Sequence, residues 1–243
     1  MPAPLRFAFL HGGGQGGWVW AETIAALHHQ AHGATVQAKA FDLPGCGEKR
    51  GMDVSQLTVR DVAAQFIADL AQADLAPCVL VGHSNAGTIL PLVAGLRPEL
   101  VRRYVYVSCI APPPGVTVSE VMRPRHAIAD GATGETQAAR LRRMFCNDMD
   151  EGQADDFMAK LGHDHWPTLE ALNETGWDYE QLADRAASYV ICTKDQALPP
   201  AWQEEFATRL QVQRRAYIDA GHQAMNTRPQ WLADILLQEA HIP

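Results

Sequence analysis

GHSNAG, residues Gly82 to Gly87, directly follows the apolar run PCVLV at residues 77–81. The pattern predicts a buried strand that turns sharply into a helix, with Ser84 at the apex of the turn. A turn of this G-x-S-x-G type exposes a serine hydroxyl above the edge of a sheet and directs backbone N–H groups at an incoming carbonyl. Its flanking residues must be small because strand and helix approach closely, and Ala86 stands where the second glycine is usual. The stretch therefore predicts a nucleophilic serine on an α/β scaffold.

A glycine-rich loop near the start of the chain is the second informative feature. The strand-like run Leu5–Leu10 is followed at once by HGGGQGGW, residues 11–18. The spacing fits neither the dinucleotide-binding fingerprint nor a Walker phosphate loop, which ends in Gly-Lys-Ser or Gly-Lys-Thr. We interpret the loop as part of an oxyanion hole, with one N–H group from Gly13 and the second from Asn85.

The candidate general base and its acid lie late in the chain. His222 stands in the segment DAGHQAM, residues 219–225, directly after an apolar-alternating run. Asp195 stands on the loop TKDQALPP, residues 193–200, after another strand-like run. Asp195 is therefore the candidate for orienting His222 and stabilising its imidazolium. Asp219 is a rival acid, but it would have to fold back along its own loop to reach His222.

In these motifs the chain resembles α/β-hydrolases of the small-molecule esterase group that includes plant methylesterases and hydroxynitrile lyases. The matching segments are LHGGGQGGWVW, FDLPGCGEKR, VLVGHSNAG, YVICTKDQALPPAWQEEF and IDAGHQAMNTRP. They extend from one end of the chain to the other, and only the middle third lacks a motif. The resemblance implies a catalytic triad of Ser84, Asp195 and His222, and it implies that no cofactor takes part.

Length and composition agree with this interpretation. The chain has 243 residues, of which 47% are hydrophobic and 20% are charged, and its formal net charge is −8. Such values suit one α/β domain, and the negative charge argues against nucleic-acid and anionic-membrane partners. The five cysteines form no C-x-x-C pair, so they predict reduced, buried thiols and no zinc site. We expect a cytoplasmic protein, because the N-terminus leaves no room for a signal peptide and no apolar run reaches membrane-spanning length.

Strand-like and helical patterns alternate along most of the chain. The expected strands are Leu5–Leu10, Thr35–Phe41, Cys78–Val81, Arg103–Ser108, Tyr189–Cys192 and Val212–Ile218. The expected helices between and after them are Val19–Gln30, Val59–Ala73, Asn85–Leu96, Pro200–Arg209 and Arg228–Ala240. The alternation predicts a mostly parallel sheet of about six strands with helices on both faces. The active site should then lie beyond the carboxyl ends of the strands.

The alternation stops between residues 111 and 187, after a run of prolines. This segment has helical stretches, such as 137–145 and 154–161, but no strand pattern. We therefore divide the chain into a hydrolase core, residues 1–110 and 188–243, and an inserted helical cap, residues 111–187. Flexible thioethers and aromatic rings suit an adaptable apolar pocket, and we expect this segment to control substrate choice but not the chemistry. The candidate substrate-binding residues are Met144, Phe145, Trp166 and Trp177.

The remaining histidines of interest, in the 163–165 segment and at position 83, are expected to have no catalytic or metal-binding role. His163 and His165 flank Asp164, but alternating residues of this kind usually lie on a solvated loop, so we expect no metal site there. His83, next to the proposed nucleophile, should point away from the substrate and make a structural hydrogen bond.

Taken together, the motifs predict a serine hydrolase that cleaves a small, largely apolar carboxylic ester through an acyl-enzyme. The substrate is expected to be a small molecule, and the triad does not distinguish esters from amides or carbamates. A hydroxynitrile lyase and a non-catalytic ligand receptor on the same fold are the alternatives. Lyases of this group have a lysine near the catalytic histidine and a threonine beside the oxyanion loop, where this chain has Gln223 and Gly12.

Overall fold

The structure, a computed structural model, describes residues 3–123 and 136–242. Its centre is a six-stranded sheet in which all neighbouring strands run parallel. The strands are β1 (Leu5–Leu10), β2 (Val36–Phe41), β3 (Cys78–His83), β4 (Val101–Val107), β5 (Ala187–Cys192) and β6 (Arg214–Ile218). The α/β fold class expected from the alternating pattern is thereby confirmed.

The strand order is β2-β1-β3-β4-β5-β6, so the chain starts inside the sheet, moves to one edge and then returns towards the other. The direction of winding changes between β1 and β3, which are hydrogen-bonded neighbours. In open parallel sheets the loops that leave such a switch point diverge and leave a crevice at the carboxyl edge. The loops that follow β1 and β3 are the glycine-rich loop and the Ser84 turn, so the topology brings these two motifs together.

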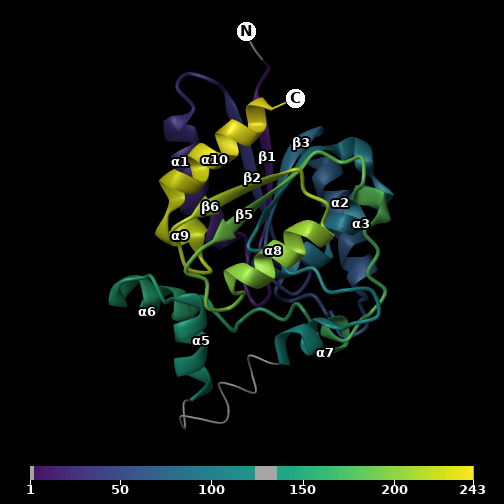
Figure 1. The fold of residues 1–243 in the computed structure, drawn as a ribbon, viewed down its shortest axis with the longest axis vertical. Coiled ribbons are helices and arrows are strands. Elements are labelled where there is room, and N and C mark those ends of the chain that lie inside the picture. Colours follow the sequence, from purple (N-terminus) through teal and green to yellow (C-terminus); the bar gives the residue numbers. More distant parts are fainter. Residues whose placement is uncertain (1–2, 124–135, 243) are drawn as a thin grey trace.

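Helices cover both faces of the sheet. The helices α1 (Ala21–Gln30) and α10 (Pro229–His241) lie on one face, whereas α2 (Val59–Gln72), α3 (Leu90–Leu96) and α8 (Pro200–Arg209) lie on the other (Figure 1). Alternate side chains of each strand pack into opposite layers, because the side-chain period of a strand is two residues. The central strands β3 and β5 are buried along their whole length, as is usual for parallel strands covered on both faces.

The predicted boundaries differ from the observed ones for local reasons. The helix expected at 154–161 is α6 (Glu151–Lys160), which begins earlier because Asp150 and Gln153 form a reciprocal capping box. The strand expected from 212 begins at Arg214, because the Val212 N–H group donates to the Ala207 carbonyl and closes the end of α8. The helix expected from Asn85 is a 3₁₀ turn that leads into α3.

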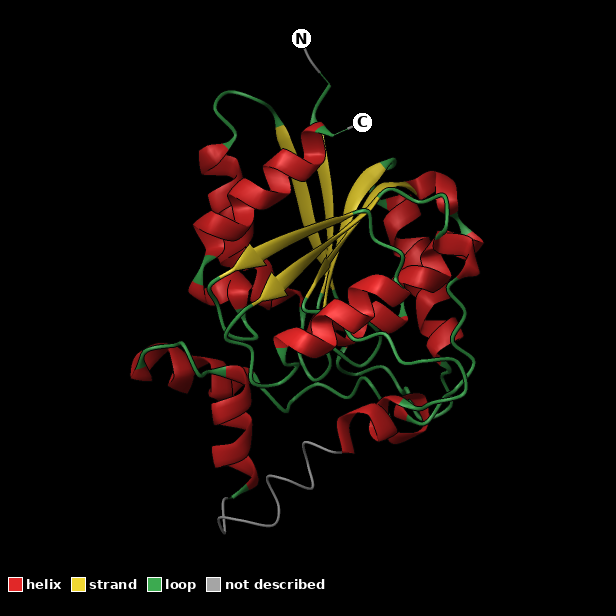
Figure 2. Cartoon of the chain, viewed as in Figure 1, coloured by secondary structure: helices red, strands yellow, loops and turns green. Residues whose placement is uncertain are grey.

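Between β4 and β5 the chain forms α5 (Gln137–Phe145), α6 and the short α7 (Leu169–Leu172). These helices lie beyond the edge towards which the strand arrowheads point, together with most of the long loops (Figure 2). The short α9 (Ala224–Thr227) precedes α10. Within residues 3–123 and 136–242, no helix has the length and apolar character that crossing a membrane requires.

Candidate active site

Ser84 lies at the carboxyl edge of the sheet, directly after β3. It begins the 3₁₀ turn Ser84–Thr88, and its φ angle of 52° falls in the left-handed region. That conformation is unusual for a residue with a side chain, and it recurs at functional sites where the surrounding structure holds it in place. The strand-to-helix turn expected from the sequence is present, with the serine at its apex.

A line of hydrogen bonds connects Ser84 to two residues from distant segments. The His222 Nε2 atom lies 3.0 Å from the Ser84 Oγ atom, and the His222 Nδ1 atom lies 2.7 Å from the Asp195 Oδ2 atom. The side chains of His222 and Asp195 are 1% and 0% exposed, so both groups interact in a largely water-free environment. The structure therefore brings together the serine, the histidine and the acid that the sequence singled out.

Asp195 is held by neutral donors. Its Oδ1 atom accepts hydrogen bonds from the backbone N–H groups of Ala197 and Leu198, at 2.7 and 2.8 Å. Its Oδ2 atom also accepts from the Ser108 hydroxyl and from the Gln203 amide. These donors fix the carboxylate against His222 without placing a permanent positive charge beside it.

The rival acid lies elsewhere. Asp219 is about half exposed, and its Oδ2 atom pairs with the Lys194 ammonium group at 2.8 Å. The ion pair with Lys194 lowers the pKa of the Asp219 carboxyl below its usual value. The Nδ1 atom of His222 faces Asp195, and Asp219 is a surface residue.

The glycine-rich loop passes directly beside Ser84. A Cβ atom on Gly12 would lie 2.9 Å from the Ser84 Cβ atom, and one on Gly13 would lie 3.6 Å from the Asn85 Cβ atom. The backbones of Gly13 and Asn85, which are the two expected oxyanion donors, are therefore close neighbours. The loop is fixed from the segment after α6, because the Gly14 N–H group donates to the Trp166 carbonyl at 2.8 Å.

Two further buried histidines support these loops. His11 Nδ1 donates to the Gly12 carbonyl, and its Nε2 accepts from the Leu43 N–H group, so the ring is neutral. His83 Nε2 donates to the His222 carbonyl at 2.9 Å, which connects the Ser84 turn to the loop that carries His222. Burial lowers the pKa of His11 and lowers that of His83 well below its usual value. Both neutral rings therefore hold neighbouring loops together through hydrogen bonds.

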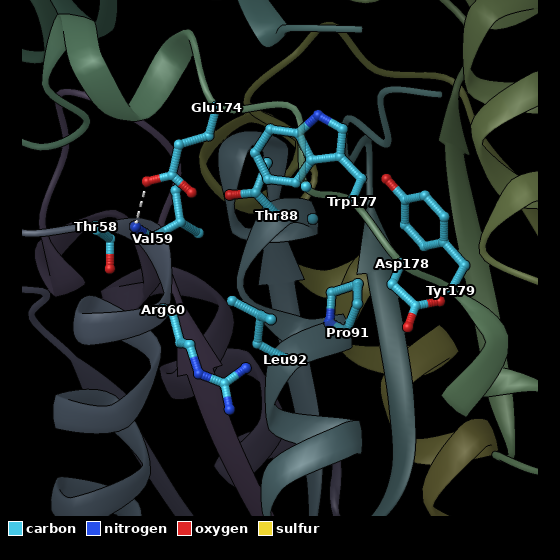
Figure 3. Close-up of a pocket in the computed structure, with 12 residues that line it drawn as sticks. Thr58, Val59, Arg60, Thr88, Pro91, Leu92, Glu174, Trp177, Asp178 and Tyr179 are labelled. Atoms are coloured by element: carbon cyan, nitrogen blue, oxygen red, sulfur yellow. Dashed lines mark hydrogen bonds between the residues drawn. The ribbon is translucent and has the colours of Figure 1, made fainter. Parts of the chain in front are cut away.

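The four candidate substrate-binding residues occupy different places. The Phe145 ring lies against the His222 ring, with 5.4 Å between their centroids. Met144 and Trp166 are buried, and Trp166 belongs to the apolar cluster that also contains buried residues of α2, α3 and α8. Trp177 lines a groove of about 330 Å³ between α2 and α3, where Figure 3 shows it over Thr88. Ser84, His222 and Asp195 are not among the described residues that line this groove.

The two histidines at 163 and 165 make different contacts. The His163 Nε2 atom bonds to the Ala159 carbonyl at the end of α6, and the backbone N–H group of His165 donates to the Gly45 carbonyl. Within the described part of the chain, no group of three or more histidine, cysteine or acidic side chains is arranged to hold a metal ion.

A family model for the alpha/beta hydrolase family matches residues 7–235. The chain belongs to this family. Probable esterase PIR7A of Oryza sativa subsp. indica is 32% identical over 125 residues, which cover 49% of this chain and 45% of that protein. The chain thus spans less than half the length of that relative.

A second relative and a solved structure match over almost the whole chain. Methylesterase 7 of Arabidopsis thaliana is 25% identical over 263 aligned positions, which cover 97% of this chain and 96% of that protein. An extracellular alpha/beta-hydrolase from a Paenibacillus species superposes with a TM-score of 0.80 at 20% identity, over 98% of this chain and all of that one. At that identity the second likeness shows the common fold.

Sequence reasoning missed several residues around this candidate site. Ser108 follows β4 and, like Ser84, has a positive φ angle, 42°. Its position at the carboxyl end of a central strand could have singled it out. Gln203 on α8 and the pair Asn147 and Asp148 between α5 and α6 had no comparable signal, because polar residues on a helix face or in a turn are common.

Proposed function

We propose that this protein is a serine esterase that cleaves small, largely apolar carboxylic esters through an acyl-enzyme on Ser84. The observation that carries the proposal is the hydrogen-bonded line from Ser84 through His222 to Asp195 beside the glycine-rich loop. Relatives that are named esterase and methylesterase support the reaction class. We further propose that the ester is a free small molecule and that no cofactor takes part.

Acylation requires the residues to act in sequence. His222 Nε2 takes the Ser84 proton while Ser84 Oγ forms a bond to the acyl carbon, and Asp195 stabilises the resulting imidazolium. The carbonyl oxygen becomes an oxyanion that the N–H groups of Gly13 and Asn85 stabilise, each donor contributing about 3–4 kcal/mol to the barrier reduction. The imidazolium then protonates the departing alkoxide. Water repeats the same steps on the acyl-enzyme and releases the acid.

The cap, residues 111–187, would supply the wall of the substrate pocket. Phe145 is the best supported of its four candidates, because its ring lies against His222, next to where the acyl group must bind. Met144, Trp166 and Trp177 are proposed as further pocket residues. Apolar contacts of this kind decide between ester sizes but supply little of the stabilisation of the tetrahedral intermediate.

Cysteine and lyase chemistry have less support than serine chemistry. Burial raises the pKa of Cys46 and of Cys78 to about 12, so these thiols stay protonated and unreactive. All five cysteines are buried and unpaired, which supports a reducing compartment such as the cytoplasm. A threonine in place of Gly12 would put a Cβ atom 2.9 Å from the Ser84 Cβ atom, so the threonine expected for a lyase would force this loop to move.

Turnover of p-nitrophenyl acetate and butyrate tests the proposal. We expect steady hydrolysis by the wild-type protein and a decrease of at least about 10⁴-fold in Ser84→Ala. An organophosphonate should form one adduct, on Ser84, detected by mass spectrometry. Binding of esters without turnover would instead indicate a receptor, and cyanide release from mandelonitrile would indicate a lyase. Adduct formation at another serine would contradict the assignment of the nucleophile.

A further inference from the structure

The turn between α5 and α6, residues 146–150, lies against the two loops that carry Asp195 and His222. We call this turn the α5–α6 corner. Figure 1 shows α5 and α6 meeting below the arrowheads of β5 and β6, the strands from which these loops leave. The corner belongs to the cap segment, whereas both loops belong to the core. It is therefore a point where the cap can act on the catalytic groups.

Two side chains of the corner bond to the backbone of these loops. The Asn147 Nδ2 group donates to the Lys194 carbonyl at 2.9 Å. The Asp148 Oδ2 atom accepts from the Gly221 N–H group at 2.8 Å. Lys194 directly precedes Asp195 and Gly221 directly precedes His222, so each bond ends one residue before a proposed catalytic residue.

The contact with Gly221 depends on its lack of a side chain. A Cβ atom on Gly221 would lie 2.4 Å from both the Asn147 Oδ1 and the Asp148 Oδ1 atoms, so only a glycine lets the corner approach this closely. Asp148 is 7% exposed, and its Oδ2 atom also accepts from the Thr227 hydroxyl at 2.8 Å. Asp148 thus joins the His222 loop to the end of α9.

We propose that Asn147 and Asp148 are positioning residues that fix the spacing of the Asp195 and His222 loops. The inference rests on the proposed function, because it assigns a role in the catalytic line described there. Small displacements of a general base reduce the rate steeply, by up to about 100-fold for a misplacement of 1 Å. The cap then takes part in the chemistry through this corner, in contrast to the expectation that it controls only substrate choice.

The control for this proposal is a cap side chain that makes the same type of hydrogen bond to the core but lies away from Asp195 and His222. The cap residue Glu174 accepts a hydrogen bond from the Val59 N–H group at 2.8 Å, at the start of α2 (Figure 3). Like Asp148, it is a cap carboxylate that bonds to a core backbone N–H group. The start of α2 carries no proposed catalytic residue, so Glu174→Ala is the matched control for Asp148→Ala.

The experiment compares Asp148→Ala, Asp148→Asn, Asn147→Ala and Glu174→Ala with the wild-type protein on p-nitrophenyl acetate and butyrate. We expect kcat to fall about 10- to 100-fold in Asp148→Ala, equally for both esters and with little change in KM. Asp148→Asn retains an oxygen that can accept from Gly221 and Thr227, so it should recover most of the loss. The rate at which an organophosphonate labels Ser84 should fall in parallel, and thermal melting identifies variants that do not fold.

The outcomes separate the two proposals. If the wild-type protein hydrolyses no ester, the proposed function fails, and this inference fails with it. If the wild-type protein is active and Asp148→Ala behaves like Glu174→Ala, or changes KM and the ester preference at unchanged kcat, only the positioning role is wrong. Should Asp148→Ala not fold, Asn147→Ala tests the bond to the Lys194 carbonyl by the same criteria.

Discussion

Two buried carboxylates lie at opposite ends of β5, and their surroundings differ in one decisive respect. Asp195 follows the carboxyl end of the strand, whereas Glu239 of α10 accepts a hydrogen bond from Ser188 at its start. Glu239 also pairs with the guanidinium groups of Arg103 and Arg214, at 3.3 and 3.0 Å. Both carboxylates are almost fully buried, and both accept a serine hydroxyl.

The difference between them is the charge of their partners. Glu239 is compensated by two permanent cations, an arrangement that holds helix α10 to the sheet. Among the described residues, the hydrogen-bond partners of the Asp195 carboxylate are neutral donors and His222. A permanent cation beside Asp195 would disfavour protonation of His222, because like charges raise the cost of a second positive charge. We therefore expect Glu239 to contribute mainly to stability and Asp195 to contribute mainly to the proposed catalysis.

Asp195→Asn should give the largest effect and is the strongest test of this division. We expect kcat to fall about 10⁴-fold, because an amide holds the His222 ring in the wrong tautomer. The free energy of unfolding should change much less. The matched control is Asp219→Asn on the neighbouring loop, which should retain nearly full turnover of p-nitrophenyl acetate. If Asp219→Asn were the more damaging change, the assignment of the acid would be wrong.

Glu239→Gln should produce the opposite result. Breaking a buried ion pair leaves the arginine charges uncompensated, which costs about 3–5 kcal/mol. We expect a loss of that order in the free energy of unfolding, measured by urea denaturation. Turnover per active site, counted by organophosphonate labelling, should stay close to that of the wild-type protein. A fall in kcat as large as that of Asp195→Asn would remove the distinction between the two ends of β5.

The serine hydroxyls of Ser108 and Ser188 donate to Asp195 and Glu239, and removing each of them should give a smaller effect than changing the carboxylates. Ser108→Ala removes a donor to the carboxylate of Asp195, and a hydrogen bond to a charged group is worth about 1.5–3 kcal/mol. We expect kcat to fall about 10- to 100-fold, since His222 loses part of its orientation. Ser188→Ala removes the corresponding donor to Glu239, so it should lower stability and leave kcat unchanged. Equal kinetics of the two variants would contradict the interpretation.

The four candidate pocket residues should give the smallest effects, and they differ by position. Phe145→Ala removes a ring beside His222, so it should change kcat/KM unequally across esters of increasing acyl length, by about 1–3 kcal/mol. Alanine variants of Met144, Trp166 and Trp177 test the same expectation. A uniform change for every ester, or a lower melting temperature alone, would make a residue part of the cap core and not of the pocket.

Local sequence patterns were sufficient to predict most of the strands and helices of the fold. The predicted strands agree with the observed ones within about two residues at each end. The inner strands β3 and β5 were marked by apolar runs, because parallel strands covered on both faces are buried along their length. The helix 200–209 was predicted with both of its boundaries, and the proline at its first position is typical of a helix start. Ser84, Asp195 and His222 could be singled out because each follows a strand, and carboxyl ends of parallel strands share one edge.

The sequence by itself determined the fold class, the family and the three residues proposed as the catalytic triad, because short apolar runs and turn residues carry that information locally. Only the tertiary structure decided what holds those residues in place. Ser108 reaches Asp195 from another strand, and Asn147 and Asp148 reach both loops from the cap. Such contacts join segments far apart in the chain. A serine, asparagine or aspartate in a turn looks the same in sequence whether its partner is water or the backbone beside a catalytic group.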